Sequence, residues 1–157
     1  MKTGLVLEGG AMRGIYTAGV LDVFMEHKIT FDGVIGVSAG AIHGCSYVAG
    51  QKGRSIRYYR KYSRDKRFMS FYSLKITNML DEVDLIRASA SMPYVSRIVS
   101  YKRKKLLDGG CTDSIPVRAF QKLGYEKCVV VLTRDEKYRK KPENMKLSGV
   151  MYHRYPE

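Results

Sequence analysis

The segment Gly36-Val37-Ser38-Ala39-Gly40 constrains the fold of this chain more than any other. Two apolar residues precede it, as expected of a short buried strand, and a stretch of small, helix-compatible residues follows it. A Gly-x-Ser-x-Gly sequence between a strand and a helix is typical of a nucleophile elbow, a turn so tight that the serine adopts strained backbone angles. The serine hydroxyl then lies at the helix N-terminus, where the helix dipole favours negative charge. The alternative is an ordinary Gly/Ser turn.

Strand-like and helix-like segments alternate along the chain. The apolar run at residues 128–132 is typical of a strand covered on both faces. The alternation predicts an α/β fold with three α/β/α layers around a mostly parallel sheet. The expected strands are residues 4–8, 34–37, 95–101, 105–107 and 128–132, and the expected helices are residues 15–28, 39–49, 54–64, 83–90 and 116–123.

The composition fits one globular domain over residues 1–157. The chain has no signal-peptide pattern and no apolar run of the roughly 20 residues that a membrane-spanning helix needs, which favours a cytoplasmic protein. Its cysteines are odd in number and form no CxxC pair, which favours reduced thiols over disulfides or a metal site. They are Cys45, Cys111 and Cys128.

The net charge of +13 is large for 157 residues. Basic residues cluster at 52–67, 97–105 and 137–141, and such surfaces attract polyanions, including anionic lipid headgroups. In the helix expected from Arg54 onward, basic residues recur at three- and four-residue spacing beside tyrosines, as in a helix that lies on a membrane surface. A solvated amphipathic helix is the simpler interpretation.

Residues 9–14, Gly-Gly-Ala-Met-Arg-Gly, form a glycine-rich loop directly after the first strand. Its backbone N–H groups are able to converge on one point, which suits the oxyanion of an acyl-transfer reaction. A dinucleotide-binding loop is the rival, but Gly-x-Gly-x-x-Gly would require glycine at position 11, which is Ala11. The pattern therefore favours an oxyanion loop.

Asp108, followed by Gly109 and Gly110, is expected at the C-terminal end of a strand, where open parallel sheets place their active sites. Asp-Gly is also a common turn pair. A Ser-Asp-His triad would need a histidine after Asp108, and His153, near the C-terminus, is the one candidate. His43 is expected to point away from the serine. The sequence therefore favours a Ser38–Asp108 dyad without histidine.

These three motifs together resemble the patatin-like phospholipases. The segments LVLEGGAMRGIYTAGVLDVF, ASASMPYVS and LLDGGCTDSIPV extend the similarity over most of residues 3–135, and the small bacterial members are the most similar subgroup. The resemblance implies a modified α/β hydrolase without a metal or other cofactor, in which Ser38 is the nucleophile and Asp108 the general base. It also implies that the N–H groups of Gly9, Gly10 and Ala11 form the oxyanion hole. The supporting loop residues are Arg13, Gly14, Gly36, Ala39, Gly40, Gly109 and Gly110.

The chain departs from the family pattern in two places. Ala11 replaces the third glycine of the first loop. The family also has a sizeable segment between the region near Leu80 and the ASASMP stretch, whereas Asp81 follows Leu80 directly here, and relatives continue beyond the last strand. Either the protein is a shortened member of the family, or residues are missing near positions 80 and 81 and at the C-terminus. The closely matching flanks favour missing residues.

The function expected from these features is hydrolysis of lipid acyl esters, of the phospholipase A or lysophospholipase type, through an acyl-enzyme. Peripheral contact with an anionic membrane is one use of the basic surface. The alternative is a catalytically inactive protein on the same scaffold that binds lipid or a polyanion. Nucleic-acid binding has only the charge in its favour, because no helix-turn-helix, zinc-knuckle or RNA-binding pattern is present. A soluble ester or thioester is a third possible substrate class.

Overall fold

Three parallel strands form the central sheet. The computed structural model describes residues 1–63, 83–93 and 98–139. Within these residues the sheet has the order β2-β1-β5, and both neighbours of the middle strand run parallel to it. Parallel neighbours require crossover connections, and helices fill them here. The strands are β1 (Thr3–Leu7), β2 (Gly33–Gly36) and β5 (Lys127–Val131).

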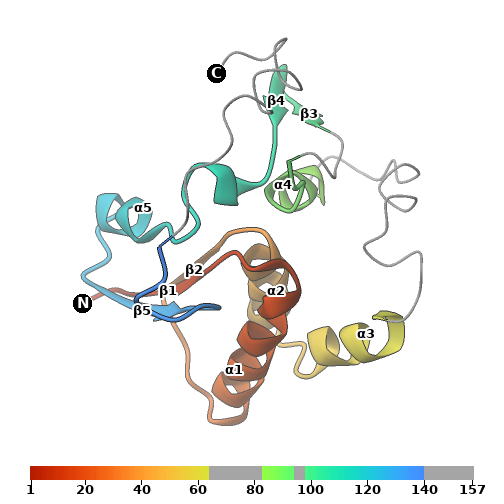
Figure 1. Ribbon diagram of the computed structural model, residues 1–157. Coiled ribbons are helices and arrows are strands. Elements are labelled where there is room, and N and C mark those ends of the chain that lie inside the picture. Colours follow the sequence, from red (N-terminus) through yellow and green to blue (C-terminus); the bar gives the residue numbers. More distant parts are fainter. Residues whose placement is uncertain (64–82, 94–97, 140–157) are drawn as a thin grey trace.

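Different helices cover the two faces of this sheet. Leu5 and Leu7 are fully buried and form the core with Leu21 of helix α1 (Gly14–Glu26). Helix α2 (Ala39–Val48) packs beside α1, and Figure 1 shows both helices on one side of the sheet and α5 (Val117–Lys122) on the other. A Cβ atom on Gly4 would lie 2.6 Å from the Phe120 ring, so glycine allows α5 to approach β1 closely. The predicted α/β fold is confirmed.

The remaining elements follow the predicted order with shifted bounds. Strands β3 (Val99–Tyr101) and β4 (Lys104–Leu106) pair antiparallel and form a sheet separate from the parallel one. Asp108 therefore follows an antiparallel hairpin, and the prediction that a strand of the parallel sheet carries it is wrong. None of the described helices is long and apolar enough to cross a bilayer. These elements are η1 (Ala11–Arg13), α3 (Arg54–Tyr62), α4 (Val83–Ser89), β3 (Val99–Tyr101), β4 (Lys104–Leu106) and η3 (Gly109–Cys111).

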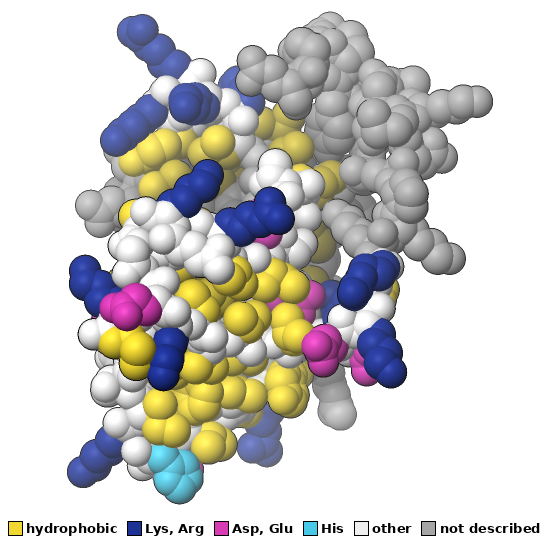
Figure 2. Space-filling model, turned by 90° about the vertical axis from the view of Figure 1, so that its left-hand side faces the viewer, with side chains coloured by type: hydrophobic (Ala, Val, Ile, Leu, Met, Phe, Trp, Pro, Cys, Tyr) yellow, Lys and Arg dark blue, Asp and Glu magenta, His cyan; other side chains and the backbone are white. Residues whose placement is uncertain are grey.

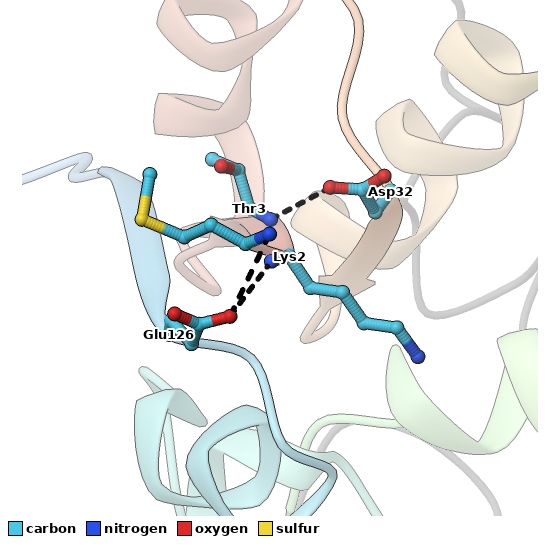
Figure 3. Close-up of polar contacts among 5 residues, drawn as sticks. Lys2, Thr3, Asp32 and Glu126 are labelled. Carbon is cyan, nitrogen blue, oxygen red and sulfur yellow. Dashed lines mark hydrogen bonds and ion pairs between the residues drawn. The ribbon is translucent and has the colours of Figure 1, made fainter.

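Acidic side chains hold the N-terminal ends of the three strands together. Asp32, just before β2, accepts a hydrogen bond from the Thr3 N–H at 2.7 Å. Glu126, just before β5, accepts one from the Lys2 N–H at 3.3 Å and lies 3.8 Å from the amino terminus. Figure 3 shows both carboxylates approaching the start of β1 from either side. These contacts fix the register of the three strands at the end of the sheet where the strands begin.

Strand β5 is less covered than its apolar sequence predicts. Val129 is 39% exposed and Val130 is 36% exposed, and β5 lies at the edge of the described sheet. These valines line a groove with Tyr16 and Phe24 of α1. Figure 2 shows hydrophobic side chains gathered on this face of the molecule. The expectation that both faces of this strand are covered is therefore wrong within the described residues.

Candidate functional site

Ser38 lies in a strained turn between β2 and α2. Its backbone angles are φ 54° and ψ −123°, in the positive-φ region that non-glycine residues rarely occupy. A Cβ atom on Gly36 would lie 2.5 Å from the Gly40 carbonyl carbon, and one on Gly40 would lie 2.5 Å from the Leu7 carbonyl oxygen. Only glycine fits at both positions. The backbone around Ser38 therefore has the geometry predicted for a nucleophile elbow.

A second serine, Ser89, supports this turn from α4. The Ser38 N–H donates a hydrogen bond to the Ser89 hydroxyl at 2.9 Å, across 51 positions of the chain. The Ser38 side chain is nearly buried, at 7% exposure. The sequence alone predicts no role for Ser89, although this residue lies within the ASASMPYVS stretch. Residue 89 ends a short helix, and its sequence context alone does not indicate a distant partner.

The glycine loop after β1 lies directly against the elbow. A Cβ atom on Gly9 would lie 3.4 Å from the Ser38 Cβ atom, so the predicted oxyanion loop and the serine are neighbours. The Gly9 N–H, however, donates to the Ser114 carbonyl at 3.2 Å. Ala11 has φ 46°, so the loop keeps a left-handed conformation although alanine replaces glycine there. Of the three N–H groups predicted to form the oxyanion hole, that of Gly9 is therefore already paired.

A buried carboxylate holds the glycine loop in place. Glu8 is 6% exposed, and it accepts hydrogen bonds from the Thr133 N–H and, at 3.0 Å, from the Thr133 hydroxyl. A Cβ atom on Gly10 would lie 2.5 Å from that hydroxyl, so the residue after β5 packs directly on the loop. The Arg13 side chain, which continues the loop, is exposed. In the sequence, this contact is indicated only by an acidic residue, Glu8, directly after a buried strand.

The aspartate loop lies beside the end of β2. The Asp108 side chain is 8% exposed, its N–H donates to the Ser91 carbonyl at 2.9 Å, and its carboxylate accepts from the Gly110 N–H at 2.7 Å. A Cβ atom on Gly109 would lie 3.3 Å from a methyl group of Val37, which precedes Ser38. The structure thus brings the two loops together. Within the described residues, no hydrogen bond joins the Ser38 hydroxyl to the Asp108 carboxylate.

The α1 and α2 termini meet behind the elbow. A Cβ atom on Gly14 would lie 2.7 Å from that of Ala39 and 2.9 Å from His43 Nε2. His43 is 3% exposed, and its Nδ1 lies 3.0 Å from the Ser55 hydroxyl. Burial lowers the pKa of His43 to about 4, so the ring is neutral near pH 7. Neither ring nitrogen is bonded to Ser38 within the described residues, as expected.

The other candidate bases and ligands contribute nothing to this site within the described residues. His27 is exposed at the end of α1, and His153 lies outside the described residues. Among residues 1–63, 83–93 and 98–139, no group of three His, Cys, Asp or Glu residues could hold a metal ion. The three cysteines form no disulfide, and Cys45 and Cys111 are exposed.

Comparison with known proteins connects this geometry to a family. Residues 5–82 match the family model described as "Patatin-like phospholipase". Escherichia coli (strain K12) "Uncharacterized protein YjjU" is 28% identical over 185 residues, which cover 84% of this chain and 52% of YjjU. "Lysophospholipase NTE1" of Meyerozyma guilliermondii is 28% identical over 177 residues, which cover 82% of this chain and 12% of that protein. Both alignments exceed the chain's 157 residues, so each relative carries aligned-region residues that this chain lacks.

Proposed function

Because the chain belongs to the patatin-like phospholipase family, we propose that it cleaves acyl esters of lipids as a serine hydrolase. The family supports a hydrolase, and the lysophospholipase relative supports a lipid ester as the substrate class. The observation that carries the proposal is the strained Ser38 at the N-terminus of α2, with the glycine loop packed against it. Acyl transfer requires a hydroxyl and backbone N–H donors around one point, and the contact between the glycine loop and the elbow supports such an arrangement.

In the proposed mechanism, Asp108 acts as general base and Ser38 as nucleophile. The Ser38 proton passes to the Asp108 carboxylate while the serine oxygen bonds to the ester carbonyl carbon. The N–H groups of Gly10 and Ala11 stabilise the resulting oxyanion, and the Gly9 N–H would join them only by leaving the Ser114 carbonyl. The ester C–O bond then breaks, and Asp108 returns its proton to the leaving alcohol. A water molecule, deprotonated by Asp108, hydrolyses the acyl-enzyme and releases the fatty acid.

The cellular setting is part of the same proposal. We place the enzyme in the cytoplasm, with peripheral contact to anionic membranes that contain its substrate, and assign it no metal, cofactor or nucleic-acid partner. The net charge of +13 supports attraction to an anionic surface. Leu80 and Asp81, between which a segment is proposed to be missing, lie outside the described residues. The long alignments support it, since both relatives carry extra residues within the matched region.

Paired substitutions test the dyad. We expect Ser38→Ala and Asp108→Asn each to lower hydrolysis of a short-chain ester by at least about a thousandfold, the scale on which nucleophile and base substitutions act in serine hydrolases. Ser38→Ala should also abolish labelling by a fluorophosphonate. Ser100→Ala and Asp113→Asn are the matched controls, because both residues are exposed and lie on neighbouring segments. Circular dichroism should show that all four variants are folded.

A non-catalytic role on the same scaffold is the second candidate. It is favoured by two observations: the Ser38 hydroxyl and the Asp108 carboxylate are not hydrogen-bonded in the described structure, and the Gly9 N–H is already paired. This candidate predicts that the folded wild-type protein does not react with a fluorophosphonate but still binds lipid vesicles. Wild-type turnover that survives Ser38→Ala would contradict the dyad in a different way, by placing the nucleophile elsewhere.

A further inference from the structure

Helix α3 (Arg54–Tyr62) carries positive charge on its outer face and no acidic residue. Arg54, Arg57 and Lys61 share this face with Tyr58, and all four side chains are exposed. Arg57 donates to the Lys52 carbonyl at 3.2 Å and Arg54 donates to the Gln51 side chain, and both acceptors are neutral. None of the ion pairs among the described residues includes a residue of α3. The charge of this face is therefore available to an anionic partner.

The inner face of α3 is joined to the catalytic elements. Tyr59 is 8% exposed, and its ring centre lies 5.6 Å from that of His43 on α2. The Tyr59 hydroxyl donates to the Ala11 carbonyl at 3.4 Å, and Ser55 contacts His43 Nδ1. Ala11 belongs to the glycine loop and holds a left-handed conformation that alanine rarely adopts, so it depends on surrounding contacts of this kind. A change in the position of α3 would therefore change the geometry of the glycine loop.

We propose that α3 docks the protein on anionic lipid surfaces and that Tyr59 couples docking to the glycine loop; this inference rests on the proposed lipid substrate. Guanidinium and ammonium groups bind lipid phosphates through charge-assisted hydrogen bonds, and an exposed tyrosine suits a membrane–water interface. Because Tyr59 contacts the glycine loop, a membrane held by α3 lies on the side of the protein that carries this loop. Restraining α3 there stabilises the Ala11 conformation and increases turnover at the lipid surface.

Docking is tested by neutralising two charges on the outer face of α3. The double variant Arg57→Gln/Lys61→Gln should bind vesicles of phosphatidylglycerol and phosphatidylcholine roughly 30-fold more weakly than wild type in sedimentation assays, since each basic group near an anionic surface contributes roughly a fivefold effect. Binding to phosphatidylcholine vesicles alone should be weak for both proteins. Turnover of a monomeric soluble ester reports separately whether the catalytic centre is intact.

Helix α5 offers a closely matched control. Arg118 and Lys122 are exposed and have the same residue types and spacing as Arg57 and Lys61. Arg118→Gln/Lys122→Gln lowers the net charge equally, but α5 lies on the opposite side of the sheet from α1 and α2 (Figure 1). We expect this variant to bind anionic vesicles like wild type. Equal weakening by both double variants would overturn the assignment of docking to α3 and leave only a general charge effect.

The coupling is tested by Tyr59→Phe, which removes the hydroxyl and keeps the ring. This variant should bind anionic vesicles like wild type but lose most of the increase in turnover that vesicles produce relative to a monomeric ester. A merely structural role of Tyr59 would lower both rates together and leave their ratio unchanged, which would overturn the coupling.

Three further outcomes test the docking inference and the proposed function separately. Tighter binding of a DNA duplex than of anionic vesicles, abolished by Arg57→Gln/Lys61→Gln, would overturn lipid docking in favour of nucleic acid. Vesicle binding that depends on α3, without turnover of any ester by the wild-type protein, would support docking and overturn the hydrolase. Ester turnover by a wild-type protein that does not bind anionic vesicles would support the hydrolase and overturn docking.

Discussion

The serine loop and the aspartate loop lie side by side but are held by different forces. At the serine loop, Gly36 and Gly40 allow backbone atoms of β2, α2 and β1 to approach so closely that a single added methyl group would overlap them. Ser38 stays in a strained conformation because its surroundings permit no other. Asp108, by contrast, has relaxed angles of φ −53° and ψ 128°, and hydrogen bonds hold it.

This difference separates the roles of the two loops. Close backbone packing fixes the serine loop in one geometry, and any change in it displaces the sheet. Hydrogen bonds of the aspartate loop are individually weaker and easier to rearrange, so the carboxylate can move relative to the serine without unfolding the sheet. In the proposed mechanism, Ser38 is therefore the fixed part of the site and Asp108 the part that is able to move.

The largest effect expected from this comparison is that of Gly40→Ala. The added Cβ atom would lie 2.5 Å from the Leu7 carbonyl oxygen and 2.9 Å from that of Glu8, which are backbone atoms of the central strand. Overpacking of this kind should lower the free energy of unfolding by about 3 kcal/mol or more. Thermal unfolding followed by circular dichroism measures the change.

Gly109→Ala is the counterpart in the aspartate loop. Its added Cβ atom would lie 3.3 Å from a methyl group of Val37, and a side chain yields more readily than a backbone does. We expect a loss of less than about 1 kcal/mol, within the range of tolerated small changes. Similar losses in the two variants would contradict the proposed difference between the loops.

How well the sequence predicts each region follows from the same physical difference. The elbow was predictable because its glycines, flanking strand and helix are adjacent in the chain. The contacts of Ser89 with Ser38, and of Glu8 with Thr133, join segments 51 and 125 positions apart, and local patterns do not encode such pairs. The hairpin before Asp108 was predicted as two strands, but its separation from the parallel sheet depends on long-range pairing.

An intermediate effect is expected from pH, through His43 behind the elbow. Its pKa is about 4 in the folded protein and 6.5 in the unfolded chain, so the unfolded state binds more protons between these values. The free energy of unfolding is therefore highest above pH 6.5 and falls as the pH decreases toward 4, by about 1–3 kcal/mol from this group.

His43→Gln tests this pH dependence, because it keeps a polar side chain and removes the titration. We expect the difference in unfolding free energy between pH 7 and pH 4.5, measured with urea, to be smaller in the variant than in the wild type. The carboxylates titrate in both proteins and cancel in the comparison. Identical pH dependence in the two proteins would mean that His43 becomes protonated without loss of stability, and that the packing behind the elbow is looser than its contacts indicate.

A small effect is also expected where the two loops are joined, at Ser89. Its hydroxyl accepts the Ser38 N–H bond and lies 3.7 Å from the position of a Cβ atom on Gly109, so it contacts both loops. Ser89→Ala removes the acceptor of a nearly buried N–H group and should cost about 1 kcal/mol in stability. Since close packing fixes the elbow independently, we expect kcat to fall only a few-fold, with fluorophosphonate labelling of Ser38 retained. Ser100→Ala, at an exposed serine of β3, should change neither quantity. Loss of labelling in Ser89→Ala would contradict the proposed difference between the loops. It would mean that the hydrogen bond to Ser89 of α4, and not close backbone packing, holds Ser38 in its strained conformation.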